Sequence, residues 1–404
     1  MREKIVVTGM GAVTPIGAGV EEYWTNLTGG VCGVGPITRF DPSALAVRIA
    51  AEVREFHPER HMPKPLIGQT DAFTQYAYVA AAEALGGTLP AEPERTGIVM
   101  GTALAGVATT ANTQEVLTNA VHKNVGPRFV PRILGNIAAA QISIAHDIRG
   151  PSLTLSTACA SGGDAVAAGA SLLLSDEADA VLVVGAESIL CPLVIYSLSN
   201  AHALSRSNAD PLHASRPFDA DRNGFVIGEG GGAMILETES HARRRGAVIC
   251  GELAGWANNN DAYHVTTPAP DGAMAAACMR KALRKAGLEP GEIGYINAHG
   301  TATRDGDAAE GAAIQAVFGT ARPKVSSTKG ATGHMMGAGG ITEAIACIQA
   351  IRTGLLPPTL NLDRPEFDLD FVAGAPCERE ITAAMTNAFG FGGQNSSLIF
   401  RRYP

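Results

Sequence analysis

The chain has 404 residues, of which 46% are hydrophobic and 17% are charged, so we expect one large two-part domain or two domains. A formal net charge of −8 argues against a general affinity for nucleic acid. No apolar run is long enough to cross a bilayer, and the first strand-like segment follows without the pattern of an export signal. These features predict a cytoplasmic protein that binds neither nucleic acid nor membrane.

Short apolar runs rich in β-branched residues alternate with helix-like segments along the chain, which predicts an α/β fold with largely parallel sheets. The expected strands cover residues 4–9, 96–100, 152–156, 180–185, 232–236, 248–254, 294–298, 323–326 and 395–400. The expected helices cover residues 21–27, 71–85, 160–174, 273–286, 307–318 and 337–352.

The order of these segments repeats. In the first half, a strand runs through a turn containing Cys159 into an Ala/Gly-rich helix, and the strand at 181–185 follows. In the second half, a strand ending near His299 precedes a turn containing His334, another Gly/Ala-rich helix, and the strand at 395–400. This order predicts an internal duplication with halves 1–245 and 246–404, and chance similarity of βαβ units is the alternative.

Seven cysteines are dispersed along the chain without a C-x-x-C pair, which does not describe a disulfide framework: Cys32, Cys159, Cys191, Cys250, Cys278, Cys347 and Cys377. We expect most of them to be buried apolar residues. Cys159 differs because small residues surround it where a strand turns into a helix, which is the arrangement that exposes a nucleophile. The positive end of the helix dipole would favour its thiolate. An inert buried thiol is the alternative.

Two histidines lie at comparable junctions. His299 follows a strand and precedes Gly300, and His334 lies just before a small-residue helix. If a pseudo-twofold axis relates the halves, Cys159 and His334 occupy near-equivalent helix starts and face one another. Each histidine alone is more often structural. The three residues could instead hold zinc, but they lack short ligand spacing and a neighbouring carboxylate, so we predict no metal site.

Glycine-rich segments give a weaker signal. The run from Phe389 to Gly393 would let backbone amides approach a substrate, although a tight turn before the last strand explains it equally well. The runs 101–106 and 228–232 lack the Gly-x-Gly-x-x-Gly spacing with a downstream acidic residue, and the chain has no Gly-Lys-Ser/Thr loop. A nucleotide-binding site is therefore not predicted.

At these residues the sequence resembles the elongating β-ketoacyl-[acyl carrier protein] synthases of the thiolase superfamily, including the ketosynthase subunits of type II polyketide systems. The resemblance covers essentially the whole chain. Its most specific segments are Thr157-Ala158-Cys159-Ala160-Ser161-Gly162, Asn297-Ala298-His299-Gly300-Thr301, Ser327-Thr328-Lys329-Gly330-Ala331-Thr332-Gly333-His334 and Asn387-Ala388-Phe389-Gly390-Phe391-Gly392-Gly393. It implies a thiolase-like duplicated α-β-α-β-α sandwich, in agreement with the repeat.

The resemblance also implies an activity, the decarboxylative condensation of a cysteine-bound acyl chain with malonyl-acyl carrier protein, in fatty acid or polyketide/polyene elongation. Cys159 would carry the acyl chain, and the N–H groups of Cys159 and Phe391 would form the oxyanion hole. His299 and His334 would donate hydrogen bonds to the malonyl thioester carbonyl. Supporting residues near His334 would be Lys329 and Glu343.

Further positions follow from the same resemblance. Thr301 and Thr303 match residues along the path of the phosphopantetheine arm, Phe391 matches the gatekeeper of the acyl tunnel, and Leu104 and Leu198 would bound the acyl pocket. No cofactor is implied beyond the phosphopantetheine of the carrier protein. The partners implied are an acyl carrier protein and either a second copy of the chain or a chain-length-factor-like subunit.

Two details distinguish this chain from its superfamily relatives. Initiating synthases have Asn where this chain has His334, and chain-length factors lack the nucleophile that Cys159 supplies. The alternatives are a non-decarboxylating thiolase-like acyltransferase or a non-catalytic chain-length-determining subunit.

The basic cluster that docks carrier proteins in this family is absent from residues 66–70. We expect either a partner subunit or other cations of this chain to take its place, and the candidates are Lys123, Arg128, Arg132 and Arg206. His202 stands where the fatty-acid enzymes tend to have Arg.

Overall fold

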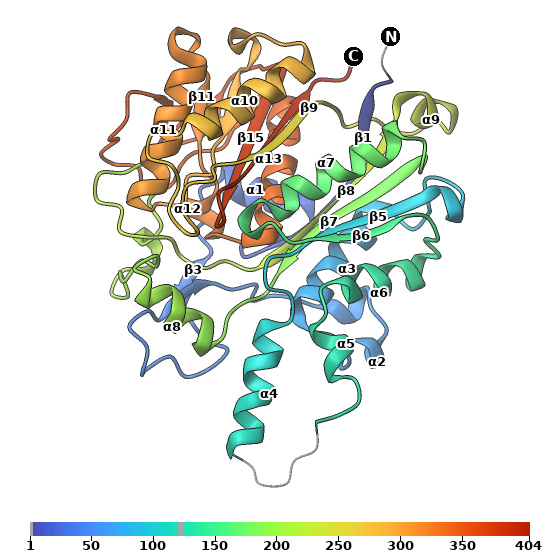
Figure 1. Cartoon of the computed structure of the whole chain (residues 1–404), viewed down its shortest axis with the longest axis vertical. Helices are drawn as coiled ribbons and strands as arrows, with labels where there is room; N and C mark the ends of the chain where they lie inside the picture. Colours follow the sequence, from blue (N-terminus) through green and yellow to red (C-terminus); the bar gives the residue numbers. More distant parts are fainter. Residues whose placement is uncertain (1–2, 120–124) are drawn as a thin grey trace.

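The computed structural model describes residues 3–119 and 125–404, which form two sheets and three helical layers in alternation (Figure 1). The helices are α1 (Val20–Thr28), α2 (Lys64–Ile67), α3 (Ala72–Leu85), α4 (Val107–Asn119), α5 (Phe129–Ile133), α6 (Asn136–His146), α7 (Ser161–Leu174), α8 (Pro192–Asn200), α9 (Glu239–Arg244), α10 (Ala273–Ala286), α11 (Arg304–Phe318), α12 (Lys329–Thr332) and α13 (Gly339–Thr353). Within the described residues, no helix is both long and apolar enough to span a membrane.

The first sheet has the strand order β6-β5-β7-β8-β1. Its strands are β1 (Ile5–Thr14), β5 (Thr96–Gly101), β6 (Ser152–Leu155), β7 (Ala180–Glu187) and β8 (Gly230–Thr238). β5 is parallel to both β6 and β7, whereas β8 is antiparallel to β7 and β1. The carboxyl ends of β5, β6 and β7 therefore lie at the same edge of the sheet, where side chains for chemistry can gather.

The second sheet repeats this pattern in the order β11-β10-β15-β16-β9. Its strands are β9 (Gly251–Asn260), β10 (Tyr295–Asn297), β11 (Lys324–Ser326), β15 (Ala383–Gly390) and β16 (Gln394–Arg401), and β13 (Asp370–Phe371) extends its outer edge. As in the first sheet, one strand is parallel to both neighbours: β10 is parallel to β11 and β15. β16 is antiparallel to β15 and β9.

The matching strand orders give the counterpart of each element and correct one prediction. The segment at 395–400 was matched to the strand at 181–185, but the strand parallel to β10 is β15, which the sequence pattern did not reveal. β15 is therefore the counterpart of β7, and β16 is the counterpart of β8. Buried and exposed residues do not alternate along β15, because six of its eight residues are buried, so the period-two pattern of a half-exposed strand is missing.

The two sheets join along one short edge. Ile5, Val6 and Val7 of β1 pair with residues of β9, so a continuous hydrogen-bonded ladder runs from one half into the other. Three further short pairs complete the strands: β2 (Gly17–Ala18) on β1, β3 (Val34–Pro36) with β4 (Ile49–Ala51), and β12 (Leu355–Leu356) with β14 (Cys377–Glu378).

Five layers result, and they confirm the predicted thiolase-like α-β-α-β-α sandwich. α3 and α6 cover the outer face of the first sheet, and α10 and α11 cover the outer face of the second. α7 and α13 lie between the sheets and contact both, and their alanine and glycine residues are almost entirely buried (Figure 1). Seven helices were not predicted from sequence: α2, α4, α5, α6, α8, α9 and α12. Of these, α4 has no fully buried residue and projects from the body.

The starts of α7 and α13 cross at very short distance. A methyl group added at Gly340 would lie 2.5 Å from the backbone N of Gly163, and one added at Gly162 would lie 2.7 Å from the carbonyl oxygen of Gly337. Only glycine allows backbone to approach backbone this closely. The crossing therefore fixes the two helix starts relative to each other.

We predict that Gly340→Ala lowers the free energy of unfolding by about 1–3 kcal/mol, the cost of inserting a methyl group into a packed core. Denaturant unfolding of the purified protein measures the change. Gly291→Ala is the matched control, because a methyl group there meets nothing within 4 Å. Equal stability of the Gly340 and Gly291 variants would contradict the importance of the crossing.

Candidate active site

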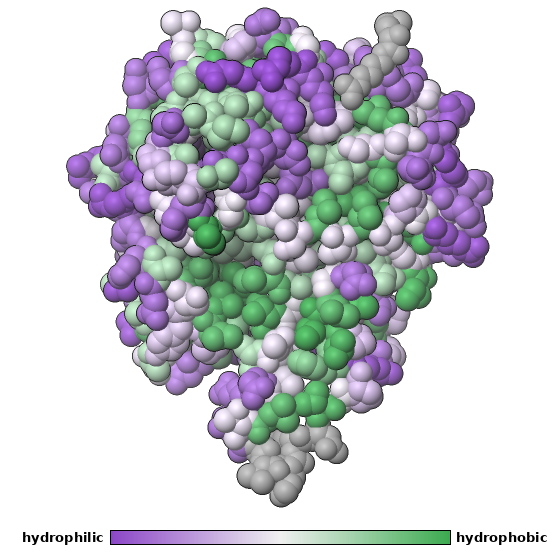
Figure 2. Space-filling model, in the orientation of Figure 1, coloured by the Kyte–Doolittle hydropathy of each residue, from purple (hydrophilic) through white to green (hydrophobic). Residues whose placement is uncertain are grey.

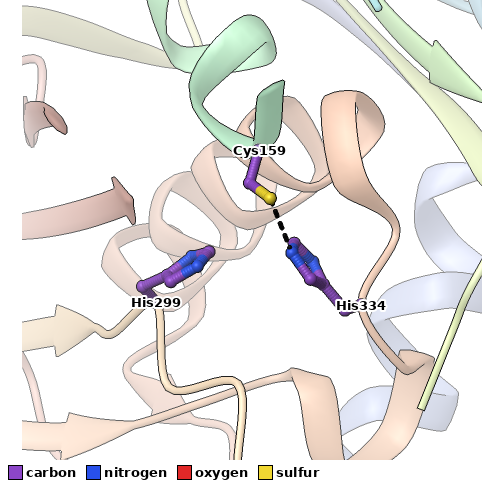
Figure 3. A group of neighbouring side chains, drawn as sticks. All are labelled: Cys159, His299 and His334. Carbon is purple, nitrogen blue, oxygen red and sulfur yellow. Dashed lines mark hydrogen bonds between the residues drawn. The ribbon is translucent and has the colours of Figure 1, made fainter. Parts of the chain in front are cut away.

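Cys159 sits in a strained turn between β6 and α7. The turn Ala158–Ala160 is a single 3-10 turn, and Ala158 adopts a left-handed φ of 51°. The Ser161 hydroxyl holds it, accepting the Thr157 N–H at 2.9 Å and donating to the Ala158 carbonyl at 2.7 Å. The turn directs the Cys159 sulfur away from the helix axis toward the second half of the chain (Figure 3).

The second half contains the same turn. Met336–Ala338 is a 3-10 turn before α13, and Met336 has a φ of 46°. Ala158 and Met336 are thus counterparts, which makes Gly337 the counterpart of Cys159. His334 lies three residues earlier, and its Nε2 is 3.0 Å from the Cys159 sulfur. The two helix starts face one another as predicted (Figure 3).

The hydrogen bonds of His334 determine which ring nitrogen carries the proton. The Met336 N–H donates to Nδ1 at 3.3 Å, so Nδ1 is the acceptor. In a neutral imidazole the proton then resides on Nε2. Burial and the Lys329 charge hold the pKa of His334 well below its ordinary value, so the ring is neutral. His334 therefore presents an N–H donor to the sulfur and to any group bound beside it.

His299 completes the cluster from the end of β10. Its backbone N–H and that of Gly300 donate to the two carboxylate oxygens of Glu310, at 2.8 and 2.7 Å. Its ring lies 5.2 Å from the His334 ring, nearly perpendicular to it. Burial, followed by the charge of Lys329, holds the pKa of His299 well below its ordinary value. Two neutral imidazoles thus converge on one sulfur.

Lys329 and Glu343 form a buried ion pair behind His334, and their side chains are only 2% and 4% exposed. The pairing brings a cation into the interior beside both imidazoles. Burial raises the pKa of the Glu343 carboxyl, and the Lys329 ammonium opposes that rise. Neither residue lines the cavity, so both act on the site through their neighbours.

The thiol differs from expectation in one respect. Burial raises the pKa of Cys159 to about 12, although the Lys329 charge and the N–H groups of Phe391 and Cys159 lower it. The expected preference for the thiolate is therefore wrong for the resting site, because removal of water outweighs the helix start and the nearby donors. The same N–H groups are the two that the sequence predicted for an oxyanion hole.

A cavity of about 290 Å³ opens onto the sulfur and both imidazoles. All five remaining predicted site residues line it: Leu104, Leu198, Thr301, Thr303 and Phe391. The Thr301 and Thr303 hydroxyls share a hydrogen bond of 2.9 Å. The Phe391 side chain is 42% exposed, and the preceding Gly390 packs against the Cys159 turn, where an added methyl group would lie 3.0 Å from the Cys159 N.

Three residues beside the site were not predicted. Glu310 fixes the His299 loop, and burial raises its pKa to about 7. Met336 lines the cavity with its sulfur 3.9 Å from that of Cys159. Glu187 ends β7 and is completely buried. For Glu187 the available signal was an acidic residue at the end of an apolar strand, and for Glu310 it was an acidic residue among the Ala and Gly residues of α11. Nothing in the sequence marked Met336.

The Cys159, His299 and His334 ligand atoms all lie within 4.8 Å of one another, and no fourth His, Cys or carboxylate among the described residues joins them. Such a group is compact enough to contact one ion. The N–H donors directed at the sulfur favour stabilisation of negative charge at this point over a closed four-ligand metal site.

The cations expected to dock a carrier protein are separated on the surface. Arg128 and Arg132 line a hollow beside α4, whereas Arg206 is exposed near the end of α8 and donates to the Ser199 carbonyl. Lys123 lies outside the described residues.

A thiol and an imidazole at facing helix starts of a thiolase-like sandwich, joined by a second imidazole from a strand end, define an acyltransferase of the condensing type. The sequence matches the beta-ketoacyl synthase N-terminal domain over residues 2–242 and the beta-ketoacyl synthase C-terminal domain over residues 250–363. The chain belongs to the β-ketoacyl synthase family.

Relatives and solved structures agree. The 3-oxoacyl-[acyl-carrier-protein] synthase 2 of Coxiella burnetii is 38% identical, over 99% of each chain. A structure of the ishigamide ketosynthase/chain length factor aligns with a TM-score of 0.91 and 34% identity, covering 100% of both chains. A structure of a type II PKS acyl-carrier protein in complex with its ketosynthase bound to the hexaketide aligns with a TM-score of 0.89 and 31% identity, covering 100% of both chains.

We predict that both imidazoles stay neutral at pH 6, where ordinary histidines with a pKa of about 6.5 are mostly protonated. Because the pKa values are lowered, protonation begins only at more acidic pH. NMR titration of the ring protons measures this, with His299→Ala and His334→Ala giving the assignments. Titration of either ring with a midpoint near 6.5 would contradict the buried, neutral pair.

Proposed function

We propose that this chain catalyses decarboxylative Claisen condensation with Cys159 as the nucleophile and His299 and His334 as the donors to malonyl. The observation that carries the proposal is the contact of 3.0 Å between the Cys159 sulfur and His334 Nε2, with His299 across the same cavity. Family membership supports the reaction class, and the geometry supports the division of roles.

The first half-reaction transfers an acyl chain. The sulfur attacks the thioester carbonyl, the carbonyl oxygen takes negative charge, and the N–H groups of Cys159 and Phe391 stabilise it. The leaving thiolate of the carrier receives the proton that the Cys159 thiol gives up, so the charge balances. Because the resting thiol has a raised pKa, thiolate formation must be coupled to substrate binding, when donors and substrate replace water.

The second half-reaction uses the imidazoles. A malonyl thioester that loses CO₂ leaves an enolate, whose oxygen needs donors that do not deliver a proton to carbon. Neutral N–H groups from His334 and His299 meet that need, since a neutral imidazole is a poor acid. The enolate carbon then attacks the acyl carbonyl and the C–S bond to Cys159 breaks. Cys159 leaves as a thiolate, which takes up a proton from solvent and returns to the resting thiol. The buried ion pair of Lys329 and Glu343 supports His334, because burial and the Lys329 charge together keep this imidazole neutral.

We assign the substrates to phosphopantetheine on an acyl carrier protein. Thr301 and Thr303 line the cavity and their hydroxyls suit the amide groups of that arm, while Leu104 and Leu198 also line it and their side chains suit an acyl chain. The similar solved structure of a type II PKS acyl-carrier protein in complex with its ketosynthase supports this partner. No further cofactor enters the proposed steps.

We further propose a two-subunit assembly, formed either by two copies or with a chain-length-factor-like subunit. β6 ends the sheet with its outer edge unpaired among the described residues, and Leu153 on it is 42% exposed. Apolar surface continues over α4 and α5 in the lower part of Figure 2, with Val116, Val130 and Leu134 each at least 44% exposed. An edge strand and an apolar face of this kind are expected to be covered.

The duplicated halves remain assigned to 1–245 and 246–404, a division that the matching strand orders support. The first half supplies the thiol and the second supplies both imidazoles. Each half-site is therefore incomplete alone.

We predict that Cys159→Ala abolishes condensation, because no acyl-enzyme can form, but leaves malonyl decarboxylation measurable, because both imidazoles remain. Product analysis with acyl and malonyl carrier proteins measures the first, and CO₂ release measures the second. Cys377→Ala, which removes a partly exposed cysteine outside the cavity, is the control. Full elongation by the Cys159 variant would refute the nucleophile.

We predict that His334→Ala lowers malonyl decarboxylation by about 10²-fold or more, the scale of losing one preorganised oxyanion donor. CO₂ release at saturating malonyl carrier protein gives the rate. His57→Ala, at an exposed histidine, is expected to behave as the wild type. A wild-type rate in the His334 variant would remove His334 from the mechanism.

A further inference from the structure

Glu187 is a buried carboxylate that the reaction steps above do not use. It is fully buried at the end of β7, and no Lys, Arg or His among the described residues forms an ion pair with it. Burial raises its pKa to about 7, against the effect of its hydrogen bonds. An acidic group kept in such a place is costly unless its hydrogen bonds are needed.

Its four hydrogen-bond donors come from two segments, one that precedes the Cys159 turn in the chain and one that follows it. The Thr102 hydroxyl and the Leu104 N–H donate to Oε1, each at 3.1 Å, and the Ala103 N–H donates to Oε2 at 2.6 Å. The fourth donor is the N–H of Gly337, also to Oε2, at 3.2 Å. A single carboxylate therefore fastens the β5–α4 loop of the first half to the turn before α13 of the second.

Both fastened segments form the wall of the cavity next to the sulfur. Ala103 and Leu104 line it from the first segment, and Met336, which precedes Gly337, lines it from the second. The Met336 sulfur lies 3.9 Å from that of Cys159. A different carboxylate serves His299, because Glu310 holds its loop, whereas His334 accepts the N–H of Met336 in the turn that Glu187 anchors.

Backbone strain makes this anchoring necessary. Ala105 and Met336 have left-handed φ values of 47° and 46°, and the Thr102 hydroxyl, itself bound to Glu187, accepts the Ala105 N–H at 3.2 Å. Non-glycine residues keep such conformations only where surrounding contacts hold them. Glu187 supplies those contacts to both segments at once.

We propose that Glu187 is a positioning residue for the acyl half-reaction, which sets the cavity wall made by Ala103, Leu104 and Met336 and thereby the acyl chains that reach Cys159. This inference rests on the proposed role of Cys159 as nucleophile. Three of the four contacts of Glu187 hold the acyl wall at Thr102, Ala103 and Leu104, so a change at Glu187 must slow acylation more than decarboxylation.

The test is Glu187→Gln, which keeps the shape but places an NH₂ group against N–H donors that need an acceptor. Acylation of Cys159 by carrier-protein thioesters of several chain lengths is followed by intact mass with peptide mapping. We expect acylation to fall about 10-fold or more, by a factor that depends on chain length, as for misplaced reacting groups. Malonyl decarboxylation should fall by a clearly smaller factor, because Glu310 holds the His299 loop independently and Glu187 reaches His334 only through the Met336–Gly337 turn.

Glu229→Gln is the matched control. Glu229 is also fully buried but accepts from Val53 and Ser188 and pairs with Arg39, away from the cavity wall. Thr102→Val provides a second variant that removes one donor and leaves the carboxylate, and we expect a smaller change in chain-length preference in the same direction. It decides the question if Glu187→Gln does not fold.

The outcomes separate this inference from the proposed function. If the wild-type enzyme forms an adduct on Cys159 and both variants keep its chain-length profile, the role of Glu187 is wrong and the nucleophile stands. Equal losses in acylation and decarboxylation would also overturn the inference, because they indicate a general structural role. Absence of any Cys159 adduct in the wild type would overturn the nucleophile and this inference with it.

Discussion

The close crossing of α7 and α13 is the constraint on which the site depends. Glycine backbone meets glycine backbone at the starts of these helices, so the turns that carry Cys159 and His334 are brought within hydrogen-bond distance across the boundary between the halves. Each sheet packs against both helices and holds their direction. The thiol and the imidazole do not need long flexible side chains to meet, since the backbone has already placed them.

Burial at this crossing determines the electrostatics. It raises the pKa of the thiol and lowers the pKa of both imidazoles, so the resting site holds neutral groups around the cavity. The buried Lys329–Glu343 pair acts in the same direction on the imidazoles, because a nearby cation disfavours their protonation. Negative charge that develops on a substrate oxygen is therefore met by N–H dipoles that need no reorganisation.

Much of this could be predicted from sequence, for identifiable reasons. Cys159, His299 and His334 lie at strand–helix junctions in glycine-rich segments, and the repeated order predicted that they would meet. β15 was missed because nearly all of it is buried and shows no alternation. Glu187 was missed because its donors are backbone N–H groups far away in the chain, which no spacing reveals. The thiol pKa was wrong in direction because sequence shows the helix start but not the depth of burial.

The crossing also explains why the duplicated turns carry different chemistry. Gly337 occupies the place in the second half that Cys159 occupies in the first, and a side chain there would begin 2.9 Å from both Glu187 Oε2 and the Thr102 Cα. The anchored wall of the acyl cavity thus fills the space that a second nucleophile would need. Glycine at this point of the second half leaves room for that wall, and His334, three residues earlier, reaches the same cavity as Cys159. One strained turn thus presents the proposed nucleophile, and the matching turn packs beside it as part of the surrounding support.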